Sequence, residues 1–282
     1  MSLSDITNIR IHKDRRSEIL DRNEPLLISN EKRFVLFPIQ YNDIYAAYQV
    51  ISSKFYIPQQ FGTETYSLNS LPIGEREIIE RILLYWSYYN EQSLIFKMNN
   101  DIQIPEARCF FGFQINSQIN HRELFSILLR SVNYKHDLMD NKIELLTNLL
   151  ENESFGGRLI TYSAMESICI SSLYILKMLL LKSDELKYLI IRIDAVLNDK
   201  SEYTKFGAIL FRHCINKPNE SKFHSIIKQI VEAEIEFLVN IIGSSICSFN
   251  QSPLSEFVQF EADKICDLFK FQRIYKGENP FK

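Results

Sequence analysis

The chain has 282 residues, 46% of them hydrophobic and 24% charged, which is average for a soluble globular protein and excludes a disordered chain. Its eight glycines and eight prolines are about half the usual share, too few for a β-barrel or sandwich with frequent turns. The net charge of −3, without a basic stripe, argues against nucleic acid as a partner. We expect no membrane partner either, because no apolar run approaches the roughly 18 residues of a membrane helix and no signal-peptide core begins the chain.

The cysteines form no CxxC pair, and their number is odd. This pattern is typical of reduced thiols in the helical core of a cytoplasmic protein. The five are Cys109, Cys169, Cys214, Cys247 and Cys266.

Mixed charge dominates residues 1–24, which predicts a polar N-terminal tail. Residues 25–282 are continuously core-forming and predict one domain. Apolar residues recur there at helical spacing, in segments at about 41–56, 75–98, 105–131, 158–182, from the break at 182–184 to about 214, 219–242 and 253–270. No stretch alternates cleanly and no Asn-Gly or Asp-Gly hairpin turn occurs. We therefore predict a single all-α domain of seven or eight long helices.

Common enzyme signatures are absent: the chain has no Gly-rich phosphate loop, no GxSxG and no HExxH. Of five histidines, His12 and His136 lie in polar segments. His213 and His224 lie near helix ends, where the helix dipole is a sufficient explanation. His121 lies in mid-helix among apolar residues and is predicted to face inward, where by itself it suggests a buried, hydrogen-bonded histidine rather than a metal ligand.

Glu166 lies in the apolar run YSAMESICISSLYIL. A buried carboxylate needs a partner, because an unpaired charge away from water is costly. Lys200, on the next predicted helix, is an available partner.

Six segments together resemble the small subunits of class I ribonucleotide reductases, in the order and at the spacing of that family. The resemblance runs from about Glu24 to the end of the chain. It implies a ferritin-like helical dimer whose core holds a di-iron carboxylate site beside a tyrosine that is oxidised to a radical. The segments are FVLFPIQYNDIYAAY (ending at Tyr48), PEARCFFGFQI (105–115), AMESI (164–168), FRHCINKP (211–218), FVQFEAD (257–263) and ENPF (278–281).

Most metal-ligand positions implied by the resemblance hold residues that cannot serve as the family's ligands. A di-iron site needs oxygen donors and imidazoles, supplied as Glu-x-x-His on one pair of helices and single carboxylates on the other pair. Only His121 and Glu166 keep the ligand type. The six positions are Gly62, Gln118, His121, Glu166, Lys200 and Tyr203. The radical position is Phe125, which has no O–H, so we expect no cofactor and no catalytic residue.

Other features of the family are also altered. Glu64 and Glu202 lie near two lost ligands, but each is expected to project from a different side of its helix. Of the family's electron-transfer residues, Asp199 and His121 match, whereas Tyr45 stands at the tryptophan position. Family members continue beyond ENPF with a flexible tail that docks on the large subunit, so the chain ending at Lys282 is expected to be truncated.

The substitutions are electrostatically coherent, because an emptied four-carboxylate site would hold repelling charges in low dielectric. Here Glu166 contributes −1 and Lys200 +1, which cancel. We hypothesise that Lys200 occupies metal space and pairs with Glu166, with Gln118 and Tyr203 adding hydrogen bonds. The alternative is that Lys200 snorkels outward.

Three functions stay open at the level of sequence. The first is a metal-free, non-catalytic partner or regulator of an active, ligand-complete small subunit, in a complex with the large subunit; homodimer and heterodimer are not distinguished. The second is an active subunit with an altered metal site at His121 and Glu166, with Tyr45 or Tyr203 as the radical residue. The third is a ferritin-like scaffold unrelated to nucleotide reduction.

Overall fold

The computed structural model describes residues 19–30, 33, 35–62, 64–88, 92–131, 142–242 and 251–281. Within these residues the regular structure is ten α-helices and short 3₁₀ turns, without strands, so the all-α prediction is confirmed. The α-helices are α2 (Asn42–Ser52), α3 (Ile73–Tyr88), α4 (Gln92–Asp101), α5 (Pro105–Leu129), α6 (Lys142–Asn152), α7 (Phe155–Ser167), α8 (Ser171–Leu181), α9 (Ile190–Arg212), α10 (Glu220–Ile242) and α11 (Gln251–Phe269).

The expected number of helices was too small for three reasons. The segment 75–98 forms two helices, α3 and α4, and the segment 158–182 forms α7 and α8, separated by the 3₁₀ turn Ile168–Ile170. The third reason is α6, which was not predicted although its buried Leu146, Leu149 and Leu150 follow helical spacing.

Helix α7 begins before the glycine pair rather than after it. The Ser154 side chain caps the helix by accepting a hydrogen bond from Gly157 N. A side chain at Gly156 would meet the loop after α9, since a Cβ there would lie 2.7 Å from Pro218 Cδ and 3.0 Å from the Asn216 carbonyl oxygen. Gly156 therefore permits a close approach of two chain segments, which its position in the sequence did not reveal.

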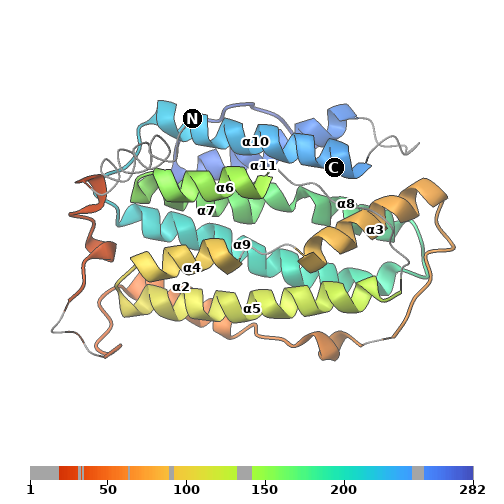
Figure 1. Ribbon diagram of the computed structural model, residues 1–282, viewed down its shortest axis with the longest axis horizontal. Helices are drawn as coiled ribbons and strands as arrows, with labels where there is room; N and C mark the ends of the chain where they lie inside the picture. The colour runs from red at the N-terminus through yellow and green to blue at the C-terminus, as the bar shows by residue number, and fades with distance from the viewer. Residues whose placement is uncertain are drawn as a thin grey trace, which may run out of the picture.

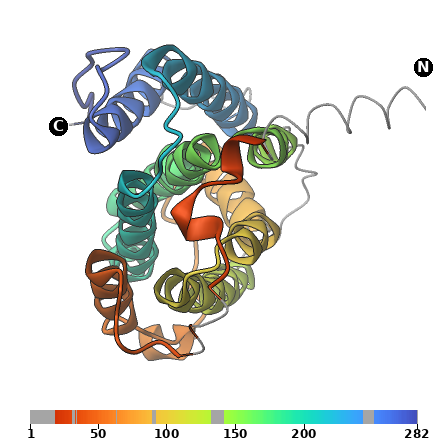
Figure 2. The same cartoon turned by 90° about the vertical axis from the view of Figure 1, so that its left-hand side faces the viewer.

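Helices α7 and α9 pack along each other at the centre of the bundle (Figure 1). Helix α5 packs against α2, α3 and α4 on one side of this pair, and α10 packs against α6, α7 and α11 on the other. Figure 2 shows most of these helices nearly end-on, with the segment around 25–30 crossing the end of the bundle. The side chains of α5, α7 and α9 that face one another therefore lie in the interior.

Helix α5 has one buried face, which lines the interior of the bundle. Pro105 occupies the first turn, where its missing N–H costs nothing. Buried positions then recur every three or four residues and include polar side chains; these are Gln114, Ser117, Gln118 and His121. Polar groups on a buried stripe need partners inside the protein. The stripe therefore marks where the functional site should be sought.

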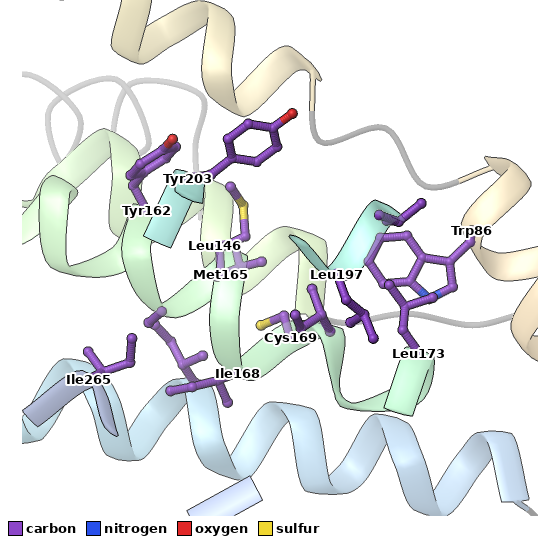
Figure 3. Close-up of a cluster of buried hydrophobic side chains, with 14 of the residues drawn as sticks. Trp86, Leu146, Tyr162, Met165, Ile168, Cys169, Leu173, Leu197, Tyr203 and Ile265 are labelled. Atoms are coloured by element: carbon purple, nitrogen blue, oxygen red, sulfur yellow. The ribbon is translucent and has the colours of Figure 1, made fainter. Parts of the chain in front are cut away.

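The segment Phe155–Leu181 has the length and composition of a membrane span, contrary to the expectation that no apolar run approaches that length. Most of it is buried inside the bundle, where it forms α7 and α8. In Figure 3, Tyr162, Met165, Ile168 and Leu173 from this segment lie among side chains of neighbouring helices. It is therefore a core segment of this fold.

The tail predicted at 1–24 lies mostly outside the described residues, but residues 19–24 pack on the domain. Asp21 Oδ1 accepts a hydrogen bond from Phe155 N at 2.7 Å, and Asp21 Oδ2 lies 3.0 Å from Arg158 Nη2. The buried Glu24 carboxylate accepts from the backbone N–H groups of Ile215 (3.0 Å) and Asn216 (2.7 Å).

Among the described cysteines, Cys169, Cys214 and Cys266 are buried and Cys109 is half-buried. Cys247, His12 and His136 lie outside the described residues.

The two histidines near helix ends have specific hydrogen-bond partners. His213 is the C-cap of α9, as expected, and its Nε2 lies 3.0 Å from Asp43 Oδ2. His224 lies near the start of α10, where the dipole does not favour a cation, so the dipole explanation was wrong there. Its Nε2 lies 2.9 Å from the Gln272 carbonyl oxygen.

Candidate functional site

A buried ion pair joins the two central helices. Lys200 Nζ, on α9, donates a hydrogen bond to Glu166 Oε2, on α7, at 2.7 Å. Both side chains are 0% exposed. Lys200 thus points into the bundle rather than outward to solvent. The two charges cancel where neither reaches water, which makes the pair tolerable in a low-dielectric interior.

A short hydrogen-bond chain supports the other oxygen of the Glu166 carboxylate. Gln114 Nε2 donates to Glu166 Oε1 at 2.8 Å, and the Tyr162 hydroxyl donates to Gln114 Oε1 at 2.7 Å. The expectation that Gln118 and Tyr203 supply these bonds was wrong. Gln114 lies one helical turn before Gln118 on the same buried face, and this spacing is the signal that could have identified it.

We expect Gln114→Ala to destabilise the protein by about 1–3 kcal/mol, because it leaves Glu166 Oε1 and the Tyr162 hydroxyl without this partner in the interior. Urea unfolding at fixed protein concentration measures the change. Gln229→Ala is the matched control, since the hydrogen bonds found for the Gln229 amide among the described residues go to Ser225 on the exposed side of α10. Equal effects of the two substitutions would contradict this assignment.

Aromatic rings surround the lysine. Lys200 Nζ lies 5.6 Å from the centre of the Trp86 ring and 5.9 Å from that of Tyr203. Trp86 Nε1 donates to Ser172 Oγ at 3.0 Å, and its ring lies 5.8 Å from that of the fully buried Phe125. Figure 3 shows Trp86 and Tyr203 among the buried hydrophobic side chains of the core. The ring faces add a cation–π attraction to the ion pair, and the sequence analysis did not assign Trp86 to the site.

His121 and Asp199 form a second buried pair. His121 Nε2 lies 2.9 Å from Asp199 Oδ2, which also accepts a hydrogen bond from Ser117 Oγ at 2.9 Å. Burial raises the pKa of the nearby Tyr203 well above its usual value, and the Asp199 charge raises it further. The Tyr203 hydroxyl makes no well-formed hydrogen bond, although nearby Ser117, which donates to Asp199, lowers its pKa slightly.

Tyr45 is not joined to this pair. Its half-buried ring lies 5.9 Å from the rings of both Phe37 and Tyr48. The hydrogen bonds found among the described residues connect Asp199 to His121 and Ser117 but not to Tyr45.

Gly62 does not lie on a helix, contrary to expectation. It follows the 3₁₀ turn Pro58–Phe61 with φ = +81°, a backbone conformation that favours glycine. Its carbonyl oxygen accepts a hydrogen bond from Arg192 Nη2 at 3.1 Å. Gly62 therefore offers neither a side chain nor a free carbonyl group.

Glu64 and Glu202, the carboxylates two residues from Gly62 and Lys200, lie away from the Glu166–Lys200 pair. Glu64 is 74% exposed, and Glu202 hydrogen-bonds to Lys54 and Lys205 near the surface. Neither is among the groups that contact Lys200 or His121.

Comparison with known proteins identifies the family of this chain. Residues 33–280 match the family model described as "Ribonucleotide reductase, small chain". This chain belongs to that family.

Two curated relatives resemble this chain along most of its length. Subunit M2 of the ribonucleoside-diphosphate reductase of Danio rerio is 28% identical over 278 residues, covering 92% of this chain and 72% of the relative. The small chain from Vaccinia virus (strain Ankara) is also 28% identical over 278 residues, covering 92% of this chain and 87% of the relative.

Solved structures show the same fold. The Rnr4 homodimer from Saccharomyces cerevisiae superposes with a TM-score of 0.82 at 22% identity, covering 100% of this chain and 96% of that one. The dimanganese(II) NrdF of Streptococcus sanguinis has a TM-score of 0.73 at 11% identity, covering 88% of this chain and 95% of that one. At these identities the likeness establishes the ferritin-like architecture and nothing further.

The residues of this small chain do not fit a di-metal centre. Two hard divalent ions need several anionic oxygen ligands, yet Glu166, the one carboxylate at the ligand positions that the resemblance implies, is neutralised by Lys200. Gln118 and Tyr203 are uncharged, and Gly62 has no side chain. Within the described ranges, no three His, Cys, Asp or Glu side chains gather as metal ligands. We therefore derive no reaction step through a metal.

Proposed function

We propose that this chain is a metal-free, non-catalytic small-subunit component of a cytoplasmic ribonucleotide reductase, which associates with a ligand-complete small subunit and with the large subunit. The ion pair between Lys200 and Glu166 carries this proposal. An ammonium at a former ligand position repels cations and satisfies the remaining carboxylate. The interior is therefore electrically balanced without metal.

The radical position supports the same proposal. Phe125 is fully buried against Trp86 and has no O–H to oxidise. Tyr203, the candidate replacement in the interior, has a hydroxyl without a well-formed hydrogen bond, and Tyr45 is not joined to the His121–Asp199 pair. These observations favour a non-catalytic subunit over an active one with an altered centre. Membership of the family argues against a scaffold unrelated to nucleotide reduction.

The surface offers apolar side chains for a helical interface. They lie on α2, on the segment after it and on α5, and each is at least 41% exposed: Val50, Phe55, Ile57 and Ile119. The related yeast structure is a homodimer. We therefore propose that the partner binds through a helical face rather than in a pocket.

The test mixes the purified chain with an active small subunit and measures dimer composition by native mass spectrometry and radical yield by electron-spin spectroscopy. We expect mixed dimers, a radical yield that differs from that of the active subunit alone, and no radical from this chain alone. The Phe125→Tyr variant is the matched control, and without metal it should also give no radical.

Two results would contradict the proposal. The first is near-stoichiometric iron or manganese in this chain after aerobic loading, together with a radical. The second is a mixture that forms no mixed dimers and leaves the radical yield unchanged.

A further inference from the structure

Polar atoms without hydrogen-bond partners in the protein gather beside the ion pair. Both amide atoms of Gln118, Nδ1 of His121 and the hydroxyls of Tyr203 and Tyr56 are buried and unpaired. Gln118, His121 and Tyr203 are each at most 3% exposed. Other such atoms lie elsewhere in the described residues, among them side-chain atoms of Glu75, Asn99, Arg158 and Arg192. This concentration distinguishes the site from ordinary imperfections of packing.

Helix geometry brings these atoms to one place. Gln118 lies one turn after Gln114, which contacts Glu166, and one turn before His121, which contacts Asp199. Across from them, Tyr203 lies one turn after both Asp199 and Lys200 on α9. The Tyr203 ring centre lies 6.4 Å from that of His121.

Tyr56 closes the group from the segment after α2. Its ring stacks near His121 with centroids 6.2 Å apart. Burial raises the pKa of Tyr56, and the Asp199 charge raises it further. In Figure 3 the hydroxyls of Tyr203 and Tyr162 both point away from Ile168 and Ile265.

The chemistry of the unpaired atoms indicates that an uncharged molecule would bind here. An amide and two phenols can each donate and accept hydrogen bonds. Because a carboxylate accepts, the His121 Nε2 atom that faces Asp199 is the donor, and in a neutral imidazole this leaves a lone pair on Nδ1. The unpaired atoms belong to an amide, an imidazole and phenols rather than to lysine, arginine or carboxylate side chains, so the group matches neither an anion nor a bare cation. A small molecule that both donates and accepts is required.

We propose that this cluster binds ordered water, which bridges the Gln118 amide, Nδ1 of His121 and the Tyr203 hydroxyl. A buried water typically makes about three hydrogen bonds to groups that would otherwise be unpaired. Such water joins the Glu166–Lys200 and His121–Asp199 pairs into one polar network across α5, α7 and α9. The inference rests on the proposed function in that the site holds no metal.

The first test is a crystal structure at a resolution of about 1.2 Å, where the polar atoms and ordered water can be placed reliably. We expect water density within hydrogen-bond distance of Gln118, His121 and Tyr203, and no anomalous signal after growth with Mn²⁺. A dry, featureless cavity would overturn the water proposal alone. A metal in the density would overturn both the water proposal and the metal-free function.

The second test measures the melting temperature of Tyr203→Phe. If the hydroxyl binds water, its loss lowers Tm by roughly 2 °C; if the hydroxyl is unsatisfied in a dry cavity, its loss raises Tm. Tyr66→Phe is the matched control, because the Tyr66 hydroxyl donates directly to the Leu128 carbonyl oxygen at 2.8 Å and its loss should lower Tm. A rise in Tm for Tyr203→Phe alone would overturn the proposal.

Discussion

Replacing Lys200 with methionine should destabilise the protein by about 3–5 kcal/mol. Methionine fills a similar volume but leaves the Glu166 carboxylate buried without its cation, which was 2.7 Å away. The double variant Glu166→Gln/Lys200→Met should recover most of this loss, because the pair is then neutral and the new amide oxygen can still accept from Gln114. Urea unfolding at equal protein concentrations measures all three proteins.

Lys205→Met is the matched control for this series. Lys205 lies on the same helix, is 53% exposed and pairs with Glu202 at the surface. Its replacement should change the unfolding free energy by less than about 0.5 kcal/mol. If Lys200→Met is as mild as Lys205→Met, or if the double variant is no more stable than the single one, the buried pair does not balance this interior.

Replacing Glu106 with glutamine should destabilise the protein by about 2 kcal/mol at neutral pH. The buried Glu106 carboxylate binds both Nη atoms of Arg33, at 2.9 and 2.5 Å, and the backbone N–H groups of Gln40 and Tyr41. Burial raises its pKa, but these hydrogen bonds outweigh burial and hold the pKa below the usual 4.5.

The sign of the pH dependence follows from this lowered pKa. The contribution of Glu106 to stability is complete above its unfolded pKa and is lost as the pH falls through the folded value. The difference between the wild type and Glu106→Gln should therefore be constant near neutrality and shrink below about pH 4.5. Urea titrations at several pH values measure it. A difference that grows on acidification would contradict this account.

Asp267→Asn is the control for Glu106. Asp267 also has a lowered pKa, because Arg273 hydrogen-bonds to it, but both side chains are about half exposed. Solvent screens such a pair, so the substitution should have a much smaller effect at every pH.

The periodicity of the sequence predicted the long helices well and the breaks poorly. The stripe of α5 continues for 25 residues after Pro105, so spacing alone defines it. The apolar run from 158 to 182 carries no Pro or Gly at the point where α7 ends, and Ile168–Ile170 forms a 3₁₀ turn instead. Helix α6 was missed although its buried leucines follow helical spacing and it has the same 11 residues as α2, which the spacing did predict.

The part of the site that depends only on residue type, the buried glutamate and its counter-ion, could be predicted from the sequence. A buried glutamate needed a counter-ion, and Lys200 was the available one. The supporting groups were not predictable in the same way. Gln114, Tyr162 and Trp86 belong to three different helices, and nothing in local spacing states which of them reaches Glu166 or Lys200.

The sequence by itself determined the set of chemical groups: a lysine, a glutamine, a tyrosine, a glycine and a phenylalanine at positions that the resemblance implies for metal ligands and a radical tyrosine. Only the tertiary structure decided that Gln114 rather than Gln118 serves Glu166, and that Gly62 leaves the helix. Residue types are fixed by covalent structure, whereas a hydrogen bond requires two atoms within about 3 Å. That distance depends on how α5, α7 and α9 are rotated and spaced by everything packed around them.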